Sequence, residues 1–177
     1  MNICVFCSMN DVAEAHAQPA REFAALLVGQ RHSLVWGGSN KGLMKLMADE
    51  VQNAGGKIIG ISAELLKDQV RANAGEMVIT KDIAERKALM LRRSDAFVIL
   101  VGGVGTLDEF TEILELKKHK LHEKPIVILN TDAFYDGLKT QFARMEREHL
   151  TKPPVSEFVY FARKPEDAMR YIESYGN

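Results

Sequence analysis

Short stretches of apolar residues recur along the chain, and most are followed directly by glycine or polar residues. The runs over residues 3–6, 96–101 and 125–130 contain almost no polar side chain. Runs this short and this rich in branched residues indicate strands that are buried on both faces of a sheet. A weaker form of the pattern predicts strands over residues 33–36, 57–61 and 76–80, and an edge strand over residues 158–161.

Segments with apolar residues at helical spacing separate these strands. The spacing predicts a helix that ends at Gly29, and further helices over residues 43–54, 82–93, 106–121, 134–149 and 165–175. The expected core faces are Phe23, Leu26 and Leu27 in the first helix, and Phe134, Leu138, Phe142 and Met145 in the helix over 134–149.

The alternation of strand and helix predicts an α/β fold. We expect a doubly wound, mostly parallel sheet with helices on both faces. Residues 62–75 are less regular, and they predict a short helix and a surface loop that could form a lid.

The composition changes this picture little. The chain has 177 residues, of which 46% are hydrophobic and 27% charged, as expected for one globular domain over residues 1–177. A net charge of −1 favours neither a nucleic-acid partner nor a membrane surface, and no apolar run approaches the ~20 residues of a membrane span. The first residues lack the basic region of a signal peptide, so we expect a cytoplasmic protein.

Cys4 and Cys7 are spaced as in a redox motif, but the strand pattern argues against a redox pair. Residues three apart in a strand point to opposite faces, with Cα atoms about 10 Å apart, whereas a disulfide needs less than about 7 Å. We therefore expect two buried thiols. The five histidines show no zinc-like spacing, so we expect no metal site.

The most informative segment follows the central apolar run. Gly102, Gly103 and Gly105 come directly after the predicted strand, and Thr106 and Glu109 then have the spacing of a capping box. Glycines that lead into a helix N-terminus form an anion site, because the backbone approaches closely and the N–H groups are free. Neither a dinucleotide fingerprint nor a Walker A lysine is present, so we expect a monophosphate.

Two further turns would join the same cleft. Gly37, Gly38 and Gly42 lie in a second glycine-rich turn between a strand and a helix, and Ser8 and Asn10 follow the first strand. Open α/β sheets bind ligands at the carboxyl ends of their strands. Each turn alone could equally be a tight connection, and Asn10 could simply start the next helix.

Glu109 and Glu112 lie on one helix face just past the glycine loop, and Arg86 is the candidate cation beside them. A carboxylate near an anomeric carbon stabilises an oxocarbenium-like transition state and activates water. Hydrolysis of an N-glycosidic bond is therefore a coherent reaction for these parts. The structural alternative is that Glu109 only caps the helix together with Thr106.

Three motifs carry a resemblance to a known family. Residues 102–109 read G-G-V-G-T-L-D-E, residues 86–90 read R-K-A-L-M, and the second glycine turn begins W-G-G and leads into G-L-M. Together they resemble the motifs of the LOG ("Lonely guy") family, the cytokinin-activating nucleoside 5′-monophosphate phosphoribohydrolases. The likeness covers nearly the whole chain.

This resemblance implies a Rossmann-like fold, a homodimer with sites near the subunit interface, and no metal or organic cofactor. It implies hydrolysis of AMP or an N6-modified adenine riboside monophosphate to free base and ribose 5-phosphate, with Arg86 and Glu109 as catalytic residues. The expected substrate-binding residues are Ser8, Gly37, Gly38, Gly42, Met44, Lys87, Gly102, Gly103, Val104, Gly105, Thr106 and Glu112.

The chain departs from the family pattern at Val101, where proline is usual, at residues 7–10, where C-S-M-N replaces C-G-S-S, and at Lys45. The altered first turn keeps a second hypothesis open, a nucleotide or cofactor carrier without turnover. An NAD-dependent oxidoreductase is poorly supported by the glycine spacing. Members of the family have often been labelled lysine decarboxylases, but no lysine here stands in a recognisable pyridoxal-phosphate context.

Overall fold

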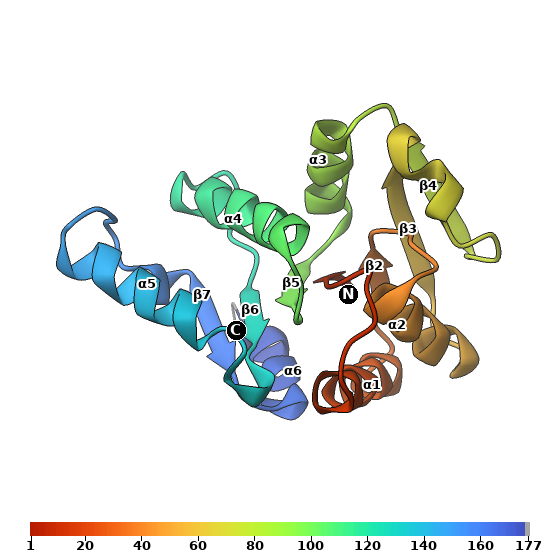
Figure 1. Cartoon of the computed structure of the whole chain (residues 1–177), viewed down its shortest axis with the longest axis horizontal. Coiled ribbons are helices and arrows are strands. Elements are labelled where there is room, and N and C mark those ends of the chain that lie inside the picture. The colour runs from red at the N-terminus through yellow and green to blue at the C-terminus, as the bar shows by residue number, and fades with distance from the viewer. Residues whose placement is uncertain (176–177) are drawn as a thin grey trace.

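The computed structural model describes residues 1–175 and contains a seven-stranded sheet (Figure 1). Its strands are β1 (Asn2–Phe6), β2 (Ser33–Trp36), β3 (Ile58–Ala63), β4 (Glu76–Thr80), β5 (Ala96–Ile99), β6 (Ile126–Leu129) and β7 (Val159–Ala162). The order across the sheet is β4-β3-β2-β1-β5-β6-β7, and every adjacent pair is parallel. The predicted doubly wound sheet is confirmed, with β7 at one edge.

Six α-helices cover the two faces of this sheet within the described residues (Figure 1). They are α1 (Glu14–Gly29), α2 (Gly42–Asn53), α3 (Ile83–Arg93), α4 (Val104–Lys118), α5 (Asp136–Arg147) and α6 (Pro165–Ser174). Apolar side chains of α1, α2 and α6 form one core layer with the sheet, and those of α3, α4 and α5 form the other. No helix in the described part of the chain is both long and apolar enough to cross a membrane.

The order of the strands fixes where a ligand can enter. The chain builds outward from β1 through β2, β3 and β4, then returns to the centre and builds outward from β5 through β6 and β7. The loops that follow β1 and β5 therefore leave the sheet in opposite directions, and a crevice opens between them at the carboxyl ends of the strands. This is the place where Ser8 and the glycines after β5 were expected to meet.

The two cysteines behave as the strand pattern predicts. Cys4 lies in the core layer of α3, α4 and α5, and Cys7 lies in the layer of α1, α2 and α6. Both are free and buried. Their side chains point to opposite faces because side chains alternate along a strand.

The expectation for Phe134 was wrong. Helix α5 begins at Asp136, not at residue 134, and Phe134 is 47% exposed. The side chain of Asn130 accepts a hydrogen bond from the Tyr135 amide and donates one to Asp136, which holds the chain in a short turn before the helix. Phe142 is buried as expected, and Leu138 and Met145 pack against the same core layer.

The loop after β1 is fastened to the start of α2. The amides of Leu43 and Met44 donate hydrogen bonds to the carbonyl oxygens of Asn10 and Ser8, at 3.2 and 3.1 Å. Gly42 makes this approach possible, since its φ is +53° and a Cβ there would lie 2.3 Å from the Asn10 carbonyl oxygen. The backbone conformation of this turn thus requires glycine at position 42.

Replacing Gly42 by Ala should lower the free energy of unfolding by at least about 1–3 kcal/mol, because a left-handed φ is strained for alanine and the clashing atoms belong to backbone. Urea unfolding measures the change. Gly29→Ala is the matched control, since a Cβ there meets nothing within 4 Å, and this substitution in α1 should be neutral or stabilising. Equal behaviour of the two variants would contradict this account of the turn.

Candidate active site

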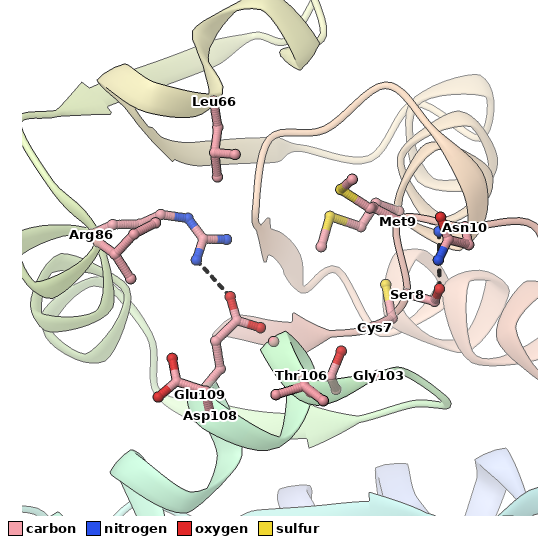
Figure 2. Close-up of a pocket in the computed structure, with 14 residues that line it drawn as sticks. Cys7, Ser8, Met9, Asn10, Leu66, Arg86, Gly103, Thr106, Asp108 and Glu109 are labelled. Atoms are coloured by element: carbon pink, nitrogen blue, oxygen red, sulfur yellow. Dashed lines mark hydrogen bonds and ion pairs between the residues drawn. The ribbon is translucent and has the colours of Figure 1, made fainter.

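A cleft of about 360 Å³ opens at the carboxyl ends of β1 and β5 (Figure 2). The loop after β1 forms one wall, the first turns of α4 form the floor, and α3 and the short turn η1 (Glu64–Gln69) close the far side. The residues that line the cleft are Cys7, Ser8, Met9, Asn10, Met44, Leu66, Ile83, Arg86, Gly103, Val104, Gly105, Thr106, Asp108 and Glu109.

The N-terminus of α4 points its amide groups at this cleft. Helix α4 begins at Val104, with Gly103 as an extended N-cap residue that provides no side-chain hydrogen bond. No described group accepts a hydrogen bond from the amides of Val104, Gly105 or Thr106. A helix start with free N–H groups and a partial positive charge binds anions, phosphate above all.

The predicted capping box is therefore wrong. Thr106 lies inside the first turn of α4 and not at its N-cap, and the Glu109 carboxylate bonds to Arg86 and not back to the helix start. The helix starts two residues earlier than the spacing suggested, because glycines can adopt the N-cap conformation without a side-chain partner. A Cβ on Gly102 would lie 2.1 Å from Thr106 Oγ1, so that glycine gives room for the threonine.

Arg86 and Glu109 form a buried ion pair at the far side of the cleft (Figure 2). Arg86 Nη1 donates to Glu109 Oε1 at 2.6 Å, and the two side chains are only 6% and 8% exposed. Arg86 Nε also donates to the Ile61 carbonyl oxygen at 2.9 Å, which fixes the plane of the guanidinium. A Cβ on Gly37 would lie 2.4 Å from Arg86 Nη2, so Gly37 leaves the space that the arginine occupies.

Burial and charge act in opposite directions on this carboxylate. Burial raises the pKa of Glu109 above its usual value, and the positive charge and hydrogen bond of Arg86 offset only part of that rise. The other carboxylate oxygen, Oε2, accepts no hydrogen bond from the described residues. Glu109 thus combines a raised pKa with a free oxygen at a cleft wall, which is the condition of a general base.

Lys87 and Glu112 lie beside the cleft rather than in its lining. Lys87 Nζ donates to both carboxylate oxygens of Asp108, at 3.1 and 3.0 Å, and pairs with Glu112. Burial lowers the pKa of Lys87, but the hydrogen bonds of Glu112 and Asp108 outweigh it and raise that pKa. This cluster links α3 to α4 next to the ion pair. Lys87 pairs with Glu112 as Arg86 pairs with Glu109.

The structure brings together most of the residues singled out in the sequence. Ser8, Met44, Arg86, Gly103, Val104, Gly105, Thr106 and Glu109 line the cleft. The remaining candidates lie just outside this lining and make the contacts described above or shape adjacent turns: Gly37, Gly38, Gly42, Lys87, Gly102 and Glu112.

Several cleft residues carried no motif in the sequence. Met9, Leu66 and Ile83 form apolar wall, and Asp108 lies between two motif positions. Leu66 comes from the segment that was predicted to be a short helix with a lid-like loop, so an available signal was the irregular pattern after β3. Cys7 also lines the cleft, but burial and the nearby charge of Glu109 raise the pKa of its thiol well above the ordinary range.

No lysine lines the cleft, and the described residues contain no group of three or more His, Cys, Asp or Glu that could hold a metal ion. What the fold and the cleft define is an α/β protein with a Rossmann-like sheet, in which an anion-binding helix start lies beside a buried Arg–Glu pair.

Comparison with known proteins agrees with this description. A family model described as "Possible lysine decarboxylase" matches residues 44–172. Cytokinin riboside 5′-monophosphate phosphoribohydrolase LOG5 of Arabidopsis thaliana is 35% identical over 98% of this chain and 77% of its own length. The probable enzyme LOGL1 of Oryza sativa subsp. japonica is also 35% identical, over 98% of this chain and 79% of its own length. The chain belongs to the LOG family.

Solved structures confirm the fold. The molybdenum cofactor binding protein of Rippkaea orientalis has a TM-score of 0.76 and 22% identity, with 98% of this chain and 95% of that chain covered. The Moco carrier protein of Chlamydomonas reinhardtii has a TM-score of 0.72 and 21% identity, with 97% and 94% covered. At this level of identity the likeness extends to the architecture alone.

Replacing Arg86 by Ala should raise the pKa of Glu109 further, because the charge that favours the carboxylate is lost while most of the burial remains. The change is measured by carbon NMR titration of the side-chain carboxyl groups. Lys87→Ala is the control, since the charge of Lys87 acts on that pKa more weakly than the charge of Arg86. An equal shift in both variants would show that the ion pair does not govern Glu109.

Proposed function

We propose that this protein hydrolyses the N-glycosidic bond of a nucleoside 5′-monophosphate, releasing the free base and ribose 5-phosphate. One observation carries the proposal. The Arg86–Glu109 pair and the free amides at the start of α4 line the same cleft. Glu109 is five positions after Val104, or about 7.5 Å along the helix axis. This distance is on the scale of a ribose 5-phosphate. The names of the relatives point to the same reaction.

The phosphate would bind at the start of α4. The amides of Val104, Gly105 and Thr106 are free to donate to its oxygens, and the helix dipole favours its negative charge. Ser8 lines the opposite wall of the cleft, within the same opening. With the phosphate held there, the ribose would extend toward Glu109.

Glu109 would act on the anomeric carbon. As the bond from C1′ to the base nitrogen breaks, positive charge develops on the ribose, and a buried carboxylate stabilises it. A water molecule adds its hydroxyl to C1′, and its proton is transferred to the departing base. Arg86 is a positioning residue in this scheme, because it fixes one carboxylate oxygen and leaves Oε2 for the substrate or the water.

A lysine decarboxylase would need different groups. Pyridoxal-phosphate enzymes hold their cofactor as a Schiff base on a lysine. The cation of this cleft is Arg86, and no lysine is among the residues that line it in the described chain. The chemistry of the lining therefore favours glycoside hydrolysis over amino-acid decarboxylation.

We propose a cytoplasmic homodimer of single-domain subunits, with AMP or an N6-modified adenine riboside monophosphate as substrate. The support is the resemblance of the motifs that contain Arg86 and Glu109, together with the enzymes to which the chain is similar.

Glu109→Gln should lower the rate of base release by about 100- to 10,000-fold, because the amide cannot carry the charge or accept a proton. Chromatography of AMP and isopentenyladenosine monophosphate reactions measures the free base. Affinity for AMP should change little, because the amides of α4 bind the phosphate. Glu115→Gln is the matched control, as Glu115 pairs with Lys118 and His119 on the exposed face of the same helix.

Two results would contradict the mechanism. One is equal base release by the native protein and Glu109→Gln. The other is tight AMP binding by the native protein without release of any base, which would favour the carrier hypothesis. In the native enzyme, protonation of Glu109 should lower the rate of base release as the pH falls. Because the pKa of Glu109 is raised, this loss should begin at a higher pH than for an ordinary glutamate.

A further inference from the structure

A small chamber adjoins the cleft behind Arg86. Its volume is about 40 Å³, and it lies between the second glycine turn and η1. Met9, Met44, Leu66 and Arg86 line both spaces, so the chamber and the cleft share a wall at the ion pair. The other lining residues are Gly37, Ser39, Ser62 and Gln69.

Two polar atoms of this lining are buried without a partner. Ser39 is only 7% exposed, and its Oγ makes no hydrogen bond within the described residues. The Oε1 atom of Gln69 is likewise buried and unbonded. Buried polar atoms in folded proteins are nearly always paired, so two unpaired atoms in the lining of one small chamber call for a hydrogen-bond partner, which a ligand group or a water molecule can provide.

The backbone around these atoms is held firmly. The Asn40 amide donates to the Gln69 carbonyl oxygen at 2.9 Å, and the Arg71 amide donates to the Gly38 carbonyl oxygen at 2.8 Å. The Arg71 side chain, itself buried, donates to Asp49 Oδ1 at 2.6 Å and to Gln52 Oε1 at 3.0 and 2.9 Å. These bonds hold the backbone of the chamber wall against α2.

We propose that this chamber binds the amino-bearing edge of a purine base, with Gln69 Oε1 and Ser39 Oγ accepting hydrogen bonds from the exocyclic amino group. The inference rests on the proposed function, because it extends the same ligand from the α4 end of the cleft past Arg86. Met9, Met44 and Leu66 provide the apolar surface that a base ring prefers.

The size of the chamber adds a second constraint. A water molecule needs about 10–15 Å³, so a chamber of about 40 Å³ holds about three groups of that size, fewer than the six heavy atoms of an isopentenylamino group. An isopentenyl substituent on that nitrogen would not fit. The chain should therefore prefer AMP to its N6-isopentenyl derivative, and it should bind inosine monophosphate less tightly, because the oxo group meets Gln69 Oε1 unless the Gln69 amide turns to present its NH2 group.

Calorimetric binding of the three nucleotides tests the proposal. Measured in the Glu109→Gln protein, so that no ligand is consumed, AMP should bind at least about tenfold more tightly than inosine monophosphate. Adding Gln69→Leu or Ser39→Ala should reduce that preference by about tenfold. Gln18→Leu, on the exposed face of α1, is the matched control and should leave the preference unchanged.

Thermal unfolding separates this role from a structural one. Both chamber substitutions remove a buried atom that has no partner, so the melting temperature should stay equal or rise while the base preference falls. A large loss of stability in both variants would overturn the proposal, since it would show that these atoms serve the fold.

The remaining outcomes are distinct. Equal affinity for AMP and inosine monophosphate, or tighter binding of the isopentenyl nucleotide, would overturn the chamber assignment while base release still supports the hydrolase. A clear AMP preference that depends on Gln69, in a native protein that releases no base, would support the chamber and overturn the hydrolase. Failure of every nucleotide to bind would overturn both.

Discussion

The buried ion pair between Arg86 and Glu109 is the constraint on which the cleft depends. Removing both charges from water is costly, and the cost is offset only when geometry and further hydrogen bonds are good. The Ile61 carbonyl oxygen provides such a bond to the guanidinium, and Gly37 provides the space for it. The pair therefore depends on the position of β3, on the glycine in the turn after β2, and on the two helices α3 and α4 that carry its side chains. A pair placed only for stability would be replaceable by apolar side chains, whereas this one borders an open cleft.

Much of the fold could be predicted because its signals are local. A parallel sheet buried on both faces leaves short apolar runs, and all seven strands were located to within two residues at either end. The pairing of Thr106 with Glu109 failed for the opposite reason, since a cap depends on where the helix starts and glycine can start it unaided. Phe134 failed because the side chain of Asn130, through a hydrogen-bonded turn, delayed the start of α5.

In the candidate site, too, the features with a local sequence signal could be predicted and those that depend on packing could not. The glycines before α4 and the carboxylate of Glu109 can be found by spacing along the chain, because one helix presents them. The Arg86 partner could be proposed only as a nearby cation, since its contact with Glu109 spans two elements. Ser39 and Gln69 had no signal at all, because an unpartnered atom is a property of the packed structure and sequence spacing does not reveal it.

The fastening of the first loop to α2 has a consequence for how this cleft can change. The carbonyl oxygens of Ser8 and Asn10, not their side chains, receive the amides of Leu43 and Met44. The loop is therefore anchored by atoms that every residue type possesses. The side chains of residues 9 and 10 are therefore free to vary toward new ligands, whereas Ser8 Oγ accepts a hydrogen bond from the Asn10 amide at 2.9 Å and helps to hold the loop. The unusual C-S-M-N turn of this chain then belongs to the adaptable part of the scaffold, and Gly42 beneath it belongs to the fixed part.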